Sequence, residues 1–162
     1  MLKNTRFAVL LLVAMAATAT SSYGHCQIPC GIYGDTSRFE ALREDFTTIE
    51  KSMKQINELS AAGGKNYNQL VRWVNNKEEH AQRVQDVVSE YFLAQRIKPD
   101  TDNYDKKLMH LHHLIVKAMK CKQTTDLGHV EGLRKHLADF EALYFGKAKK
   151  EHSDPHHGHD HK

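Results

Sequence analysis

The sequence predicts an all-α protein, an antiparallel up-and-down four-helix bundle with an N-terminal metal-binding hook. Four stretches carry apolar residues at alternating spacings of three and four, which is typical of amphipathic helices. The links between these stretches are short, so successive helices must reverse direction. Two cysteines and a histidine lie close together ahead of the first helix, and they predict the hook.

Residues 1–24 have the features of a secretory signal peptide. Two basic residues, Lys3 and Arg6, precede an apolar run at 7–17, and a stretch of small residues follows. The apolar run, about eleven residues long, is too short to span a bilayer. We therefore expect an exported protein, periplasmic or secreted, with no membrane partner once residues 1–24 are removed.

Two cleavage positions fit the small-residue stretch. Cleavage after Gly24 makes His25 the first residue of the mature protein and gives it a free α-amine. Cleavage after Ala19 leaves five residues ahead of His25 and requires a second trimming step.

The composition argues against nucleic acid as a partner. Lys and Arg number 23 against 20 Asp and Glu, and the leader takes two of the basic residues with it, so the mature chain is close to neutral. The length fits one domain. Twelve histidines are unusually many, and they point towards metal binding.

The hook, residues 25–35, places metal-binding groups close together. Cys26 and Cys30 follow His25 directly, and a proline and a glycine flank the second thiol, which disfavours a helix. A residue-one amine, the next amide nitrogen and two thiolates can form a plane of two nitrogens and two sulfurs. Such a plane suits Ni(II) or Cu(II), and the imidazole of His25 can add an axial ligand. A metal-free Cys26–Cys30 disulfide is the alternative.

The nine residues from His25 to Tyr33 fit the pattern His-Cys-x-x-Pro-Cys-Gly-x-Tyr. This pattern resembles the N-terminus of the nickel-containing superoxide dismutases. The resemblance implies one nickel per chain, held by His25, Cys26 and Cys30, that cycles between Ni(II) and Ni(III) and converts superoxide to dioxygen and hydrogen peroxide. It implies catalytic roles for His25, as the axial ligand, and for Tyr33, which closes over the open face of the metal. It also implies a homohexamer.

The resemblance assigns two further residues to the surroundings of the metal. In the family a glutamate on the first helix holds the axial imidazole, and Glu40 is the best match, although it lies one position closer to the hook. A solvated glutamate at the start of a helix is the alternative. The family's partner arginine on the second helix is replaced here by His80.

Four helices follow the hook and form a bundle domain at residues 36–150. The first covers about 24 residues after the capping sequence Asp35-Thr36-Ser37 and ends at Gly63-Gly64. The other three are expected at about 66–96, 102–122 and 125–144, with Pro99 stopping the second. The residues expected to face the core are Phe39, Leu42, Phe46, Ile49, Met53, Ile56 and Leu59; Leu70, Trp73, Val74, Ala81, Val84, Val88, Tyr91 and Phe92; Leu108, Leu111, Leu114, Ile115, Ala118 and Met119; and Val130, Leu133, Leu137, Phe140 and Leu143.

The tail, residues 151–162, is polar and rich in histidine, with no large apolar side chain. This composition predicts disorder and weak, auxiliary binding of divalent ions. The histidines concerned are His152, His156, His157, His159 and His161.

The remaining histidines and the third cysteine suggest structural positions. His110 and His113 share a helix face, but a dinuclear site with the second helix is not expected because the third helix has no Glu-x-x-His pair. His129 and His136 are expected at the polar edge of the fourth helix. Cys121 is expected to be a packing residue.

A rival interpretation comes from a different functional class, a non-catalytic periplasmic protein that binds or delivers nickel or copper. The histidine-rich tail and the N-terminal His-Cys pair serve that role equally well. This interpretation predicts a labile metal and no requirement for Tyr33 or Glu40.

Overall fold

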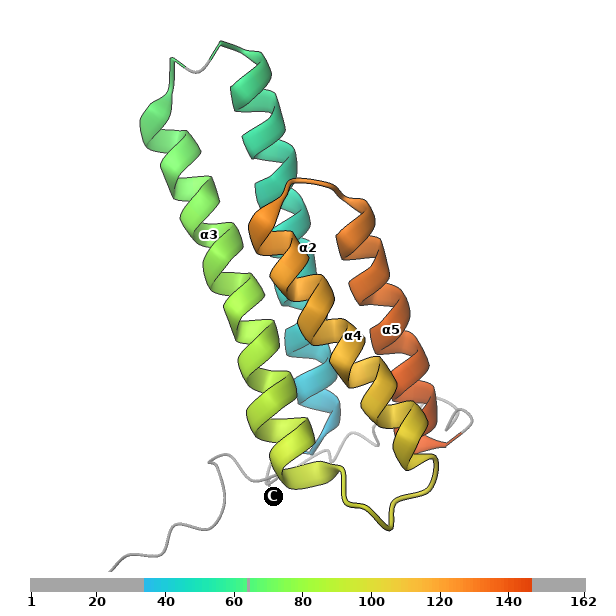
Figure 1. The fold of residues 1–162 in the computed structure, drawn as a ribbon. Coiled ribbons are helices and arrows are strands. Elements are labelled where there is room, and N and C mark those ends of the chain that lie inside the picture. The colour runs from blue at the N-terminus through green and yellow to red at the C-terminus, as the bar shows by residue number, and fades with distance from the viewer. Residues whose placement is uncertain (1–33, 64, 147–162) are drawn as a thin grey trace, which may run out of the picture.

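The computed structural model describes residues 34–63 and 65–146, and four helical stretches account for most of them. These are α2 (Thr36–Ala61), α3 (Tyr67–Asp86) with its continuation η1 (Val87–Arg96), α4 (Tyr104–Gln123) and α5 (Gly128–Phe145). Successive helices run antiparallel (Figure 1), α2 packs on α3, α4 packs on α5, and the α3–α4 contact joins the two pairs. The predicted four-helix bundle is therefore confirmed. None of the described helices is both long enough and apolar enough to cross a membrane.

An aromatic cluster fills the end of the bundle where α2 begins. Phe39, Phe92 and Phe140 are fully buried and come from α2, η1 and α5. Their ring centroids lie 5.0–5.6 Å apart in edge-to-face and stacked arrangements. Figure 1 shows the start of α2, η1 and the end of α5 at this same end of the molecule. The chain therefore enters α2, directly after the hook, beside a tightly packed part of the core.

The opposite end of the α2–α3 hairpin extends beyond the α4–α5 hairpin (Figure 1). The α4–α5 hairpin does not cover this end (Figure 1), and this explains a wrong prediction: Leu70, Trp73 and Val74 are half-buried and not part of the core. On the same stretch of α3, Tyr67 is 70% exposed and Val71 is 56% exposed.

The core face of α4 ends differently from the prediction. Met119 was expected to face inwards but is 38% exposed. Each residue turns an α-helix by about 100°, so the face that carries Ala118 continues at Cys121, three residues on. Cys121 is fully buried, which confirms its predicted packing role. Burial raises the pKa of its thiol to about 11.

A buried lysine completes the core face of α3 and caps a neighbouring helix. Lys77 is 3% exposed. Its ammonium donates to the backbone carbonyl oxygens of Cys121 (2.7 Å) and Lys122 (2.5 Å), in the last turn of α4. The last carbonyl groups of a helix have no partner within it and carry partial negative charge, so a cation there is favourable.

The second predicted helix has the expected extent, but its last ten residues, η1, form a π-helix. The backbone N–H of Ile97 donates to the carbonyl oxygen of Phe92, five residues earlier, at 2.9 Å. The wider turn of a π-helix brings residues five apart to about 50° from each other around the axis, whereas in an α-helix they point about 140° apart. Tyr91 and Arg96 therefore share a face, with the Arg96 guanidinium carbon 5.4 Å from the Tyr91 ring centroid.

Candidate functional site

The predicted metal ligands His25, Cys26 and Cys30, together with Tyr33 and the tail histidines, lie outside the described residues. The structure describes the last two residues of the hook and the first helix that follows them. These parts show where the hook ends and which described side chains lie near that end.

Asp35, the last residue of the hook, is held by donors from two other elements. Its Oδ1 accepts hydrogen bonds from the Tyr91 hydroxyl and from Nε (3.0 Å) and Nη2 (2.5 Å) of Arg96 in η1. Its Oδ2 accepts a hydrogen bond of 2.7 Å from the hydroxyl of Tyr144 in α5. We call these four residues the Asp35 anchor. It fixes the chain two residues after Tyr33.

The electrostatics of the Asp35 anchor favour an ionised carboxylate. Burial raises the pKa of Asp35, but the hydrogen bonds from Tyr91, Tyr144 and Arg96 together outweigh it, and the pKa is lowered. Burial and the hydrogen bond to Asp35 raise the pKa values of Tyr91 and Tyr144, which stay protonated donors. The hydrogen bond to Asp35 also raises the pKa of Arg96.

The anchor overturns the prediction that the side chain of Asp35 caps the first helix. Asp35 occupies the N-cap position, but its carboxylate makes no capping hydrogen bond to the helix. The carboxylate instead accepts hydrogen bonds from Tyr91, Arg96 and Tyr144, and the bonds from Arg96 join two charged groups, so it turns towards η1 and α5. Ser37 Oγ donates to the carbonyl oxygen of Gly34 at 2.9 Å. Gly34 has φ +79°, a conformation that side-chain-bearing residues rarely adopt, so glycine suits the turn that leads into Asp35.

Glu40 lies on the second turn of α2, next to the fully buried Phe39. It is exposed, and its side chain makes no hydrogen bond or ion pair with any other residue in the described ranges. Its carboxylate is therefore available to a group from outside those ranges. The predicted contact with the ring of His25 stays a prediction.

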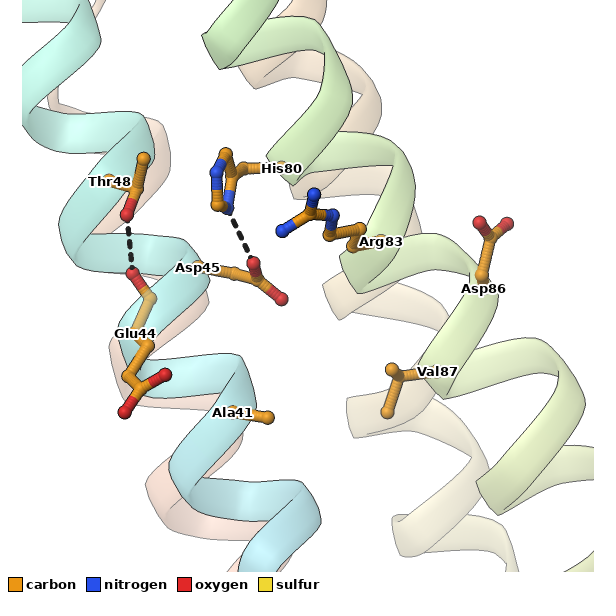
Figure 2. Close-up of a pocket in the computed structure, with 8 residues that line it drawn as sticks. All are labelled: Ala41, Glu44, Asp45, Thr48, His80, Arg83, Asp86 and Val87. Carbon is orange, nitrogen blue, oxygen red and sulfur yellow. Dashed lines mark hydrogen bonds and ion pairs between the residues drawn. The ribbon is translucent and has the colours of Figure 1, made fainter. Parts of the chain in front are cut away.

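His80 is paired with a carboxylate that sequence reasoning missed. Its Nδ1 lies 2.6 Å from Oδ1 of Asp45, across the α2–α3 contact (Figure 2). Asp45 is only 7% exposed, and burial raises its pKa against the lowering effect of the His80 hydrogen bond. The one signal in the sequence is that Asp45 stands beside Phe46 on the apolar stripe of the first helix, where a charged residue needs a partner.

The Asp45–His80 pair lies in a groove of about 370 Å³ between α2 and α3 (Figure 2). Glu40 does not line this groove, so the structure does not bring Glu40 and His80 together there. The role of His80 near the metal also stays a prediction. The lining residues are Ala41, Glu44, Asp45, Thr48, His80, Arg83, Asp86 and Val87.

The chain matches the family model of nickel-containing superoxide dismutase over residues 16–149. This range contains the hook and all four described helical stretches. No curated protein and no solved structure gives a significant match.

Proposed function

The chain belongs to the nickel-containing superoxide dismutase family, and from this premise we propose that its nickel is held by a mature N-terminus that begins at His25. As a member of the family it is a nickel-dependent oxidoreductase that disproportionates superoxide. The observation that carries the proposal is the extent of the family match, which includes the nine-residue pattern at 25–33 as well as the bundle.

The donor set of the hook fits nickel. The thiolates of Cys26 and Cys30 are soft, and the amine of residue one and the following amide add nitrogens that favour a square-planar site. The imidazole of His25 would add a further nitrogen donor to this set. When bound, nickel supplies one-electron chemistry between its divalent and trivalent states.

The chain's own residues position the hook and the substrate. We assign to Tyr33 the ordering of superoxide and water at the open face of the site. We assign to Glu40 a hydrogen bond from the ring N–H of His25, which fixes the orientation and basicity of that imidazole. The Asp35 anchor supports both roles, because it holds the end of the hook against η1 and α5.

Two further parts of the proposal concern maturation and assembly. We propose that the protein is exported and that residues 1–24 are removed after Gly24, because only then does His25 have a free amine. We also propose a homohexamer, following the family resemblance. The exposed Tyr67 and Val71 on the projecting part of α3 support an assembly that covers them.

The proposal is tested on mature protein purified from nickel-supplemented cells. Intact mass gives the N-terminus, and nickel content and the rate of superoxide decay are measured on the same sample. We expect a chain that starts at His25, one nickel per hook and fast loss of superoxide. A variant whose five tail histidines are replaced by serine separates nickel in the hook from nickel in the tail.

The matched control is the same protein with one alanine added before His25. This residue leaves every side chain intact but moves the free amine away from the site, so we expect dismutase activity to disappear. Full activity in the extended protein contradicts the assignment of the amine as a ligand. A chain that starts at His25, holds nickel tightly and leaves superoxide untouched contradicts the catalytic function itself and favours a delivery protein.

A further inference from the structure

A cluster of histidines lies between α4 and α5, apart from the proposed nickel site. His110 and His113 come from α4, and His136 and Asp139 come from α5. Each pair is spaced by three residues, so its members lie on one face of their helix. His136 is half-buried, which agrees with its expected position at the polar edge of the fourth helix, and its ring faces α4. His110 and His113 are likewise half-buried.

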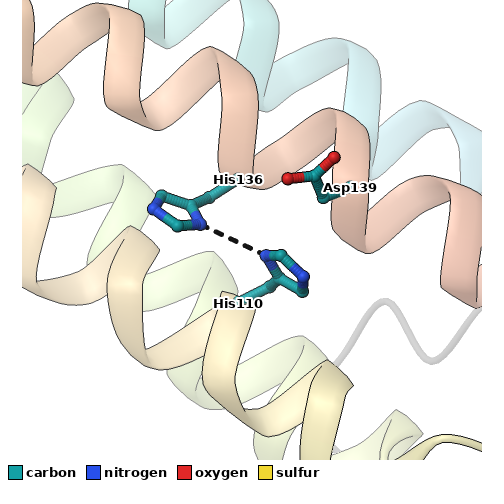
Figure 3. Close-up of side chains that lie close together, drawn as sticks. All are labelled: His110, His136 and Asp139. Atoms are coloured by element: carbon teal, nitrogen blue, oxygen red, sulfur yellow. Dashed lines mark hydrogen bonds between the residues drawn. The ribbon is translucent and has the colours of Figure 1, made fainter.

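Three of these side chains converge on one point (Figure 3). One ring nitrogen each from His110 and His136 and one carboxylate oxygen of Asp139 all lie within 4.8 Å of one another. The Nδ1 atoms of His110 and His136 are 3.2 Å apart. Two neutral imidazoles approach in this way if one ring donates its Nδ1–H to the Nδ1 lone pair of the other, or if a cation accepts a lone pair from both.

The spacing of these atoms suits a metal ion. Two nitrogens bound to a tetrahedral zinc at 2.0–2.1 Å are about 3.3 Å from each other. The observed 3.2 Å matches that spacing, and the Asp139 oxygen lies within 4.8 Å of a ring nitrogen of each histidine, so a rotation of the Asp139 side chain can bring it into range. Asp139 is exposed, so this rotation meets little resistance.

The fourth side chain, His113, orients the cluster. Its ring stacks on the ring of His136, with centroids 4.4 Å apart and planes 12° from parallel. Burial lowers the pKa of His136, and the neighbouring His113 and His110 lower it further.

We propose that His110, His136 and Asp139 form a second metal site, which binds one borderline divalent cation such as zinc across the α4–α5 contact. Two imidazoles and a carboxylate are a ligand set that zinc accepts, with a fourth position left for water. The site uses no residue of the hook and no carboxylate of the second helix. Because its ligands come from two helices, the bound ion joins α4 to α5.

Zinc binding to nickel-loaded mature protein tests this proposal. We also expect the histidine-rich tail to bind zinc weakly, so the comparison is between full-length proteins that keep the tail. We expect wild-type protein to bind one more zinc ion with high affinity than His110→Gln, as measured by competition with a chromophoric chelator. The matched control is His112→Gln, which removes an exposed histidine of α4 that is not one of the three ligands. It is expected to bind zinc like wild type.

Two more measurements keep the test decisive if His110→Gln folds poorly. Asp139→Asn changes an exposed residue, so we expect it to fold and to weaken zinc binding at least about tenfold, since even loss of an outer-shell partner costs roughly 10–100-fold. Zinc is also expected to raise the Tm of wild type and His112→Gln, and not that of His136→Gln, because it binds only the folded pair of helices. Equal zinc stoichiometry, affinity and Tm shift in all these proteins overturns the proposal and leaves a proton-sharing histidine pair.

Discussion

Three side chains donate hydrogen bonds to the carboxylate of Asp35, and two of them come from η1. We predict that Asp35→Asn lowers the free energy of unfolding by about 2–3 kcal/mol at pH 7, because an amide cannot accept all of these bonds and leaves Arg96 without its charged partner. Urea denaturation of the metal-free proteins measures the difference. Asp100→Asn, an exposed loop residue, is the control and is expected to stay within about 0.5 kcal/mol of wild type.

The same pair of proteins gives a pH dependence with a definite sign. The pKa of Asp35 is lowered from 3.8, so its contribution is fully present above pH 3.8 and is lost as the pH falls through the lower, folded-state value. The stability difference between wild type and Asp35→Asn should therefore shrink below pH 3.8. Asp45, whose pKa is raised, works in the opposite direction, but it is present in both proteins and cancels. A difference that is the same at pH 5 and pH 2.5 contradicts the assignment.

Variants of Glu40 and His80 distinguish a residue that acts at the metal from one that only stabilises the bundle. We predict that Glu40→Gln lowers the dismutase rate by roughly 10–100-fold with little change in Tm, because a carboxylate that orients a ligand imidazole affects activity by that factor. Glu44→Gln, an exposed glutamate on the next turn, is the control. Pulse-radiolysis decay of superoxide on nickel-loaded samples measures the rate.

His80→Gln is the complementary variant, because it leaves Asp45 buried without its partner. If His80 acts at the metal, the rate falls; if it serves only Asp45, the Tm falls and the rate per bound nickel stays at the wild-type value. The second result removes His80 from the proposed surroundings of the metal.

At the scale of the helices, Lys77 links α3 to the end of α4 through the carbonyl oxygens of Cys121 and Lys122. We predict that Lys77→Met destabilises the protein by about 1–3 kcal/mol, because it leaves carbonyl groups at the end of α4 without their donor. Lys106→Met, on the exposed face of α4, is the control. Chemical denaturation measures both, and amide hydrogen exchange should show the largest loss of protection in the last turn of α4. Equal stability of the two variants contradicts the capping role.

The apolar pattern of the sequence predicts the helices but not their detailed backbone geometry. The stripes at spacings of three and four predicted all four helices, because burying such a stripe is what stabilises an amphipathic helix. The π-helical form of η1 was not predictable in this way, since a stripe records which residues are buried but not whether the backbone bonds span four residues or five. For the same reason, the sequence did not predict that Tyr91 and Arg96 lie on one face of η1.

Among the functional residues, those that are contiguous in sequence were predictable and those that meet between helices were not. The nine-residue pattern of the hook was recognisable because its members are contiguous in sequence. The Asp45–His80 pair and the His110–His136 pair each join two helices. Which side chains meet across such a contact depends on how each helix is rotated about its axis, and the sequence of one helix alone does not determine this.

At the scale of the whole molecule, the projecting α2–α3 hairpin is the part that a second copy can cover. We predict that wild type sediments with the mass of six chains and that Val71→Glu shifts it towards smaller species, because a charge on this face opposes burial against a neighbour. Lys106→Glu, which changes the charge on α4, is the control. Analytical ultracentrifugation measures the masses, and a hexamer unaffected by Val71→Glu places the contact elsewhere.

The Asp35 anchor also sets a limit on reach. His25 stands ten residues before Asp35, and a fully extended chain advances about 3.3–3.6 Å per residue, so residue 25 lies within about 35 Å of the anchored carboxylate in any conformation. In an assembly, the N-terminal residues of one chain can bind a metal at a neighbouring subunit only if that subunit comes within this distance of the anchor. The anchor therefore holds one end of this segment in place, and the length of the segment restricts any exchange of metal ligands to subunits within that distance.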